Sequence, residues 1–453
     1  MVRQGLLNVE ITVRPHVLLL GLTVGIALAD SSVVTLALPR ILTDYDVAIG
    51  TLSWVLTSYN LALALAAVPA AFLARQRPTL VFGIGILVFS AASLACGLAP
   101  TIDVLIGARA VQGVAGAAVV CASLDLLSQA TGGDAPAARV WALSGILGAA
   151  VGPAVGGILT QLLGWQSIFL LQAPAMAVAL FALRGTRSAP IEEPAGRPHV
   201  AANLALLLVS GALVASSFLL VILLINGWRL EPLEAGLVVT ILPLAAIAAA
   251  RTGRRISPLW ARAASGAILI AGGTAALGWL PHSGARWTIA PQVAIGTGLG
   301  LALSALTERA LAGRSAQAVH GGWTIAARHA GIVLGLILLT PLFTADLERN
   351  EDDALAAGTE VVLESEIPPL QKVGVARDIL VAVDKAQEDV TVPDVGDAID
   401  HEDDHAYREL ASDLQKQLNR AVTNAFSRSF LVAAALGLLA LAPILIGRRD
   451  VTV

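Results

Sequence analysis

Long apolar runs separated by short polar stretches recur along the whole chain. An α-helix rises 1.5 Å per residue, so about 20 apolar residues cross the ~30 Å hydrocarbon core of a bilayer. Because hydrocarbon offers no partner to an open backbone, we expect each such run to be helical. The runs predict twelve membrane-spanning helices, at residues 16–39, 50–73, 79–99, 102–128, 137–163, 166–184, 201–226, 233–250, 263–281, 287–311, 318–345 and 428–447.

Two polar stretches divide the series of predicted spans. Residues 184–199 are Pro-rich and polar, with six spans before them and six after, which is typical of a linker between two bundles. Residues 346–426 are strongly acidic and contain short amphipathic patterns, which predict a small, mostly helical insert. The predicted organisation is an N-terminal six-helix bundle at 1–184, a cytoplasmic linker at 185–200, five helices of a C-terminal bundle at 201–345, an acidic extracytoplasmic insert at 346–426, and the last helix with a cytoplasmic tail at 427–453.

Arginines are concentrated in one set of loops and chain ends, for example Arg251, Arg254 and Arg255. The short loops on the other side carry only Arg40, Arg229 and Arg286. By the positive-inside rule, the arginine-rich set and both termini are expected to be cytoplasmic. We therefore predict a multi-pass protein of a bacterial plasma membrane, with the insert outside the cell.

The composition agrees with this assignment and excludes other classes. The chain has 453 residues, of which 56% are hydrophobic and 14% charged, and its mean hydropathy is +0.76. A soluble chain would carry more charge, so we expect no nucleic-acid partner and no soluble enzyme. Cys96 and Cys121 both lie in apolar runs and are expected to be small core residues, and we predict no metal site and no cofactor.

Few ionisable residues lie at membrane depth, where their energetic cost makes a functional role the default expectation. Asp30 and Arg109 occupy compatible depths in the first and fourth spans, so they are expected to pair. Such a pair could transfer protons, or it could be a static contact between two helices. In the eleventh span, Arg328 is expected to face the cavity between the halves. His329 could titrate or could be a hydrogen-bonded packing residue.

The fifth predicted span carries small residues on one face. Gly148, Gly152 and Gly156 are spaced at i, i+4 and i+8, so another helix can approach that face closely. Pro153 removes a backbone donor and is expected to bend the helix. Together with Gly157, these residues predict a helix that packs tightly and bends within a bundle.

The same span, read as Gly-x-x-x-Gly-Pro-x-x-Gly-Gly, resembles the antiporter motif of the drug:proton antiporters of the major facilitator superfamily. Arg109-x-x-Gln112-Gly113 resembles the fourth-helix motif of that branch, and residues 29–39 resemble its Asp-containing first helix. Residues 164–174 resemble the start of its sixth helix. The resemblance implies the major facilitator fold, a proton-coupling role for Asp30 and Arg109, and no enzymatic activity.

Two features depart from that branch. The loop at residues 71–78 lacks the acidic residue and both glycines of the family's latch between the two halves, so gating would depend on other contacts. The chain also has twelve predicted spans where its motifs resemble the fourteen-span branch, and the acidic insert is not typical of the family.

The leading hypothesis is a monomeric antiporter, surrounded by membrane lipid, that exports a hydrophobic or amphipathic small molecule in exchange for protons. Gln112, Arg328 and His329 would line its substrate cavity. One alternative is an exporter of a lipid or an envelope precursor. Another is a transporter-derived scaffold or sensor whose acidic insert binds an envelope partner.

Overall fold

The computed structural model describes residues 15–184, 196–281, 283–311, 316–364 and 405–448, and the single positions Lys372, Gly374, Val375 and Arg377. Within these residues the regular structure is entirely helical. Twelve of the helices are long and apolar enough to cross a membrane, and each lies on one of the twelve predicted spans. The prediction of an all-α polytopic membrane protein is therefore confirmed.

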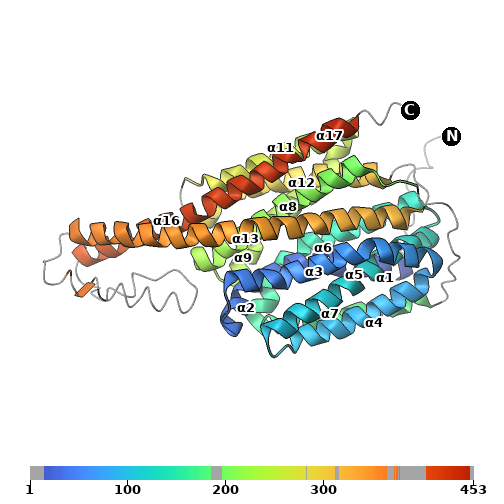
Figure 1. The fold of residues 1–453 in the computed structure, drawn as a ribbon, viewed down its shortest axis with the longest axis horizontal. Helices are drawn as coiled ribbons and strands as arrows, with labels where there is room; N and C mark the ends of the chain where they lie inside the picture. Colours follow the sequence, from blue (N-terminus) through green and yellow to red (C-terminus); the bar gives the residue numbers. More distant parts are fainter. Residues whose placement is uncertain are drawn as a thin grey trace, which may run out of the picture.

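The first six spans use seven α-helices, because the short α2 lies between the first and second spans (Figure 1). The last span of this half ends in a turn of 3-10 helix, Val178–Leu183. The α-helices are α1 (Pro15–Thr35), α2 (Leu38–Tyr45), α3 (Ile49–Gln76), α4 (Pro78–Gly97), α5 (Ile102–Thr131), α6 (Asp134–Leu163) and α7 (Gln166–Ala177).

The second half begins with α8 (Val200–Ile222), which continues as a π-helical turn at Leu223–Gly227. Its eighth span is divided at Thr240 into two short helices. The remaining elements are α9 (Pro232–Val239), α10 (Ile241–Thr252), a 3-10 turn at Gly253–Arg255, α11 (Leu259–Gly278), a 3-10 turn at Ala285–Thr288, α12 (Ile289–Leu311), α13 (Gln317–Glu364), α16 (His405–Leu439) and α17 (Leu441–Gly447).

Helices α13 and α16 extend beyond the bundle at one end of the molecule, which we call the insert end (Figure 1). Helix α13 contains 48 residues, and at 1.5 Å per residue it is ~72 Å long, more than twice the thickness of a hydrocarbon core. The start of α1 and the end of α17 lie at the opposite end, the terminal end. Residues 185–195 of the predicted linker, and residues 365–404 of the predicted insert apart from the four single positions named above, lie outside the described residues.

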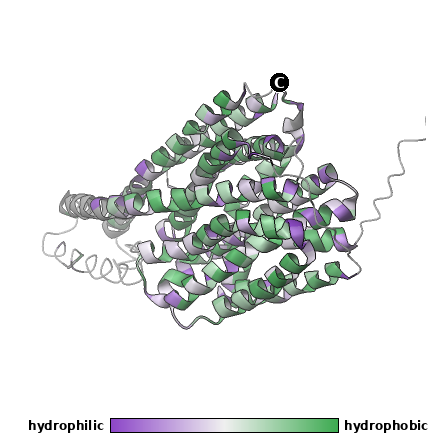
Figure 2. Ribbon diagram, turned by 45° about the vertical axis from the view of Figure 1, so that its right-hand side comes forward, coloured by the Kyte–Doolittle hydropathy of each residue, from purple (hydrophilic) through white to green (hydrophobic). Residues whose placement is uncertain are grey.

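Hydrophobic residues predominate along the helices of the bundle (Figure 2). Many large aliphatic side chains also point outward, including Leu65, which is 70% exposed, and Leu162, which is 69% exposed. In water such a surface would be a liability, whereas in a bilayer it contacts lipid chains. The chain is therefore a multi-pass membrane protein.

The two halves share an apolar core at the insert end. In this cluster Val34, Leu56 and Phe169 of the first half pack with Phe218 and Phe343 of the second. A second cluster consists almost wholly of first-half residues, and a third consists of second-half residues. The halves also meet along α3 and α13 and along α6 and α9. These contacts fix the position of the first half's polar centre relative to α13.

Candidate functional site

Asp30 and Arg109 form an ion pair inside the first half. Asp30 lies on α1 and Arg109 on α5, and the distance from Asp30 Oδ2 to Arg109 Nη2 is 2.6 Å. Both side chains are fully buried. A charge removed from water is stable only when it is paired and hydrogen-bonded, so each of these groups depends on the other.

Two glutamine side chains join the ion pair into a closed ring across α1, α5 and α7. Arg109 Nη1 donates to Gln112 Oε1 at 2.6 Å, and Gln112 Nε2 donates to Gln172 Oε1 at 3.1 Å. Gln172 Nε2 then donates to Asp30 Oδ1 at 3.1 Å and closes the ring. Gln112 Nε2 also donates to Ser93 Oγ at 2.7 Å. A change in the charge of Asp30 therefore alters the partners of three other side chains.

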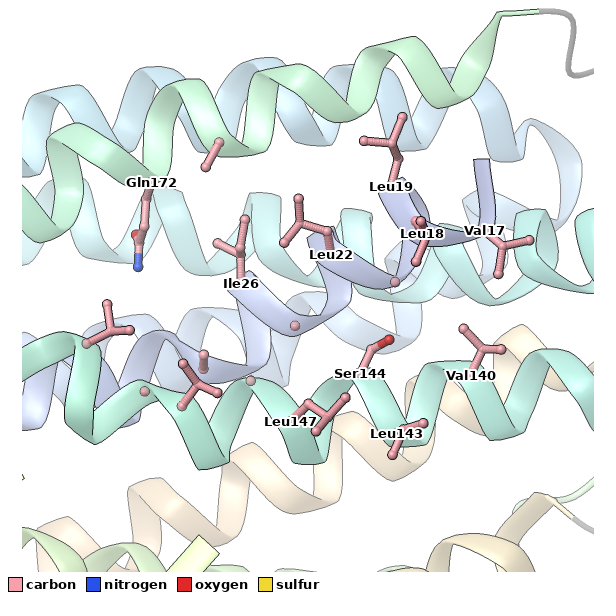
Figure 3. A pocket seen from close by; sticks show the side chains of 18 of the residues that line it. Val17, Leu18, Leu19, Leu22, Ile26, Val140, Leu143, Ser144, Leu147 and Gln172 are labelled. Atoms are coloured by element: carbon pink, nitrogen blue, oxygen red, sulfur yellow. The ribbon is translucent and has the colours of Figure 1, made fainter. Parts of the chain in front are cut away.

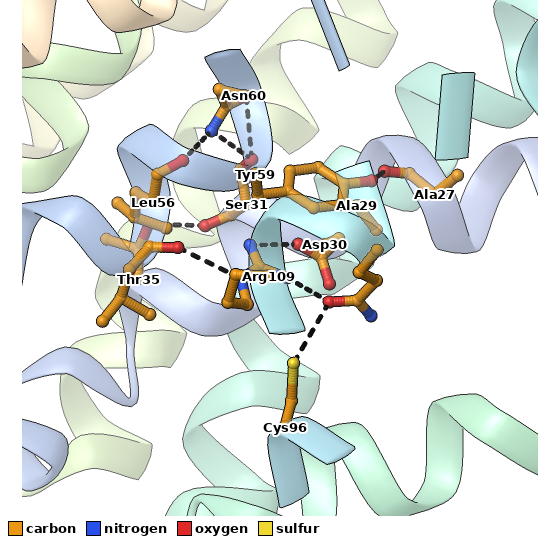
Figure 4. A network of polar contacts seen from close by, with 12 residues as sticks. Ala27, Ala29, Asp30, Ser31, Thr35, Leu56, Tyr59, Asn60, Cys96 and Arg109 are labelled. Carbon is orange, nitrogen blue, oxygen red and sulfur yellow. Dashed lines mark hydrogen bonds and ion pairs between the residues drawn. The ribbon is translucent and has the colours of Figure 1, made fainter. Parts of the chain in front are cut away.

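Aromatic rings replace water around the guanidinium group of Arg109. Its carbon Cζ lies 4.2 Å from the centre of the Tyr59 ring and 5.6 Å from that of Phe169. Arg109 Nε donates to the carbonyl oxygen of Val55 at 3.1 Å. Tyr59 is held in place by a hydrogen bond from its hydroxyl to the carbonyl oxygen of Ala27, 2.8 Å long. These cation–π and hydrogen-bond contacts orient the arginine toward Asp30 (Figure 4).

A hydrogen-bond path leads from Ser31, the neighbour of Asp30, to the second half. Ser31 Oγ lies 3.3 Å from Asn60 Oδ1 on α3 (Figure 4), and His329 Nδ1 on α13 lies 2.7 Å from the same oxygen. Asn60 Nδ2 donates to the carbonyl oxygen of Leu56 at 2.7 Å, which fixes the orientation of the amide. His329 Nδ1 must therefore carry the hydrogen and donate to Asn60.

The residues assigned to a substrate cavity from the sequence lie in three different settings. Gln112 is fully buried within the ring, and His329, 4% exposed, bridges the two halves. Arg328 is half-buried and has no ion-pair partner in the part of the chain that the structure describes. Gln172 was not selected from the sequence, although it lies in the segment at 164–174 that resembles the start of the antiporters' sixth helix.

The glycines of α6 bring its backbone against α1. A Cβ atom on Gly148 would overlap the carbonyl oxygen of Gly25, and one on Gly156 would overlap that of Val33. A Cβ atom on Gly152 would lie 2.7 Å from Ser32 Oγ. This close approach leaves α1 little freedom to rotate, so it fixes the direction in which Asp30 points.

A neighbouring face of α6, turned by about 100° from the first, contacts the second half near the insert end. A Cβ atom on Gly157 would lie 2.6 Å from the carbonyl oxygen of Pro232, and one on Gly236 would lie 2.8 Å from that of Pro153. Helix α6 therefore touches α1 with one face and α9 with the other. If one half moves relative to the other, the contact between α6 and α9 must either act as the pivot or separate.

The described part of the chain contains no cluster of three or more His, Cys, Asp or Glu side chains arranged to hold a metal ion. Cys96 and Cys121 are buried free thiols.

Three kinds of comparison bear on the identity of the chain. Residues 20–340 match the family model of the Major Facilitator Superfamily. Multidrug resistance protein Stp of Mycobacterium tuberculosis is 37% identical over 201 residues, which cover 43% of this chain and 37% of that protein. The methylenomycin A resistance protein of Streptomyces coelicolor is 33% identical over 247 residues, covering 53% of this chain and 50% of that protein. The chain thus matches half or less of the length of these relatives.

The fold is similar to that of a bacterial homologue of the human lysosomal transporter Spinster, in an inward-facing and occupied conformation. The TM-score is 0.63 at 15% sequence identity, and the match covers 96% of both chains. The twelve spans, the two-half architecture and the family match agree with one another. The chain therefore belongs to the Major Facilitator Superfamily.

Proposed function

We propose that this protein is a proton-coupled exporter of hydrophobic or amphipathic small molecules. The observation that carries the proposal is the buried ion pair of Asp30 and Arg109 within a closed hydrogen-bonded ring. Asp30 is the only carboxylate in this ring, so it is the group that can gain and lose a proton while Arg109 stays charged. The names of the relatives, which refer to resistance against multiple drugs and methylenomycin A, support the substrate class.

In this mechanism, protonation of Asp30 removes the charge that Arg109 pairs with. Ser31, the next residue on α1, is hydrogen-bonded to Asn60, which is hydrogen-bonded to His329 of α13. A shift of α1 therefore changes a contact between the two halves. Alternating access would follow from rocking of one half against the other, with the substrate bound near the midplane.

Contacts between α3 and α13 would replace the family's latch at the terminal end. Helix α3 ends at Gln76 and α4 begins at Pro78, so Arg77 alone connects them. A Cβ atom on Gly322 of α13 would lie 2.7 Å from Ala71 Cβ and 3.0 Å from the carbonyl oxygen of Ala67. We propose that the protein works as a monomer in a bacterial plasma membrane, with both termini cytoplasmic. In this orientation the contact between α3 and α13 closes the cytoplasmic side of the transporter.

Proteoliposomes with an imposed pH gradient provide the test. Asp30→Asn removes the only carboxylate of the ring. Proton-driven efflux of a hydrophobic dye should then fall at least about tenfold, because no group in the ring can carry the proton. Asp103→Asn, a matched change at an exposed position on α5, should leave efflux unchanged. Full gradient-driven efflux by Asp30→Asn would remove Asp30 from the mechanism.

A further inference from the structure

A groove of about 1540 Å³ is lined only by residues of the first half. Helix α1 forms its floor, α6 and α7 form its walls, and the end of α5 at residues 129–132 closes it toward the terminal end (Figure 3). The lining is almost entirely aliphatic. The groove is therefore a separate feature from a substrate site at the midplane between the halves.

The groove opens toward lipid. Among its lining residues Leu18 is 59% exposed, Leu147 is 42% exposed and Leu171 is 49% exposed, all within membrane-spanning helices. Its lining on α1 runs from Val17 to Val33, which at 1.5 Å per residue is ~24 Å. This length covers most of a hydrocarbon core of ~30 Å, so molecules dissolved in the membrane can reach it directly.

Gln172 is the polar side chain that connects this groove to the ion pair (Figure 3). Its Nε2 atom carries two hydrogens, and one is donated to Asp30 Oδ1 at 3.1 Å. The other has no acceptor among the residues that the structure describes. The side chain is half-buried, and an unsatisfied donor in an apolar setting costs free energy.

The depth of Gln172 excludes a lipid acyl chain as the partner of this hydrogen. Gln172 follows the start of α7 by six residues, or ~9 Å, which places it within the hydrocarbon core. At that depth a lipid offers only methylene groups, and its ester oxygens remain near the interface. A membrane-dissolved molecule that carries a hydrogen-bond acceptor would satisfy this donor.

We propose that this groove binds an uncharged hydrophobic small molecule that carries a hydrogen-bond acceptor, and that Gln172 donates to that acceptor while it holds Asp30. This inference rests on the proposed export function, because it names the site at which a membrane-dissolved substrate first binds. The volume exceeds the 300–1,000 Å³ typical of drug-sized sites, so a small molecule fits beside the aliphatic walls. Gln172 would then contact both the bound molecule and the carboxylate of Asp30, which is the proposed proton carrier.

The test uses Nile red, an uncharged membrane-soluble dye with a carbonyl acceptor. Cys96 and Cys121 are buried, so a bimane label can be attached at Leu147→Cys in the groove of the full-length protein. Titration of Nile red in phosphatidylcholine nanodiscs should quench the bimane saturably. Ala175→Phe, which fills the groove from α7, should weaken this binding at least about tenfold.

Val178→Phe is the matched control, because Val178 is a lipid-exposed residue of the same span that does not line the groove. It should leave Nile red binding unchanged, and Gln172→Leu should weaken binding as Ala175→Phe does. Equal binding by the parent and Ala175→Phe, or unchanged binding by Gln172→Leu, overturns the proposal. Monodisperse elution of each variant shows that it is folded.

Brominated phosphatidylcholine identifies the competing occupant. If its chains quench the bimane and saturating Nile red does not relieve that quenching, the groove holds lipid only and the proposal is wrong. The binding assay needs no pH gradient, so its result is independent of proton coupling. Loss of the proposed antiport with intact Nile red binding would refute the transport mechanism but not the groove site.

Discussion

Removing Arg109 and the charge of Asp30 together should cost less unfolding free energy than the sum of the two single removals. Arg109→Met deletes the 2.6 Å contact with Asp30 Oδ2 and leaves that carboxylate with one donor, Gln172 Nε2. Both partners are fully buried, so water cannot replace the lost guanidinium. Breaking a buried ion pair by removing one partner costs ~3–5 kcal/mol, and we expect a loss of unfolding free energy in this range.

Asp30→Asn is expected to lower the free energy of unfolding by less, ~1–3 kcal/mol. Arg109 still donates hydrogen bonds to the carbonyl oxygen of Val55 and to Gln112 Oε1, and its guanidinium still lies over the Tyr59 ring. In the double variant neither charge remains buried. Its loss should therefore be smaller than the sum of the two single losses by more than ~1 kcal/mol, as expected for residues in direct contact.

Urea unfolding in detergent micelles, followed by tryptophan fluorescence, measures these free energies. Trp141 and Trp165 are each only 2% exposed and lie in the first half, so they report on this region. Arg40→Met is the control, because it breaks the exposed Arg40–Asp44 pair and should cost less than ~1 kcal/mol. Additive losses at Asp30 and Arg109, within ~0.5 kcal/mol, would refute the view that each group is stable only because of the other.

Two further predictions concern helix packing. Gly148→Ala places a Cβ atom against the carbonyl oxygen of Gly25, so we expect α1 and α6 to separate and stability to fall by ~1–3 kcal/mol. A Cβ atom on Gly107 would meet no atom within 4 Å, so Gly107→Ala should be neutral or stabilising in the same urea unfolding experiment. Equal effects at both glycines would contradict the packing argument. His329→Leu leaves Asn60 Oδ1 with Ser31 Oγ at 3.3 Å as its remaining side-chain donor, which should cost ~1–3 kcal/mol. The double variant with Asn60→Leu should recover part of that loss in urea unfolding, and strict additivity would show that the bridge between the halves is not formed.

Much of the architecture follows directly from the chain. An apolar run of about 20 residues has few alternatives to a membrane-spanning helix, because length and hydropathy are local properties and the bilayer supplies a fixed thickness. For this reason all twelve spans could be predicted. Asp30 and Arg109 could be selected for a similar reason, since a charge at membrane depth is costly wherever it points.

The partners of those charges were decided by tertiary structure. Gln172 is 142 residues away from Asp30 in sequence, and His329 is 269 residues away from Asn60, so no local pattern relates them. Which helix faces meet depends on where backbones can approach, as at Gly148 and Gly25.

The membrane-facing groove was also decided only by tertiary structure. Its walls are ordinary aliphatic residues of α1, α6 and α7, and each of these helices alone resembles any other span. The space exists because α6 packs closely on α1 while α7 remains apart from it along the groove. Sequence thus determined which segments enter the membrane and which charges had to be compensated, because both depend on transfer from water to hydrocarbon. Only the packing of distant helices determined how those charges are paired and where the bundle opens to lipid.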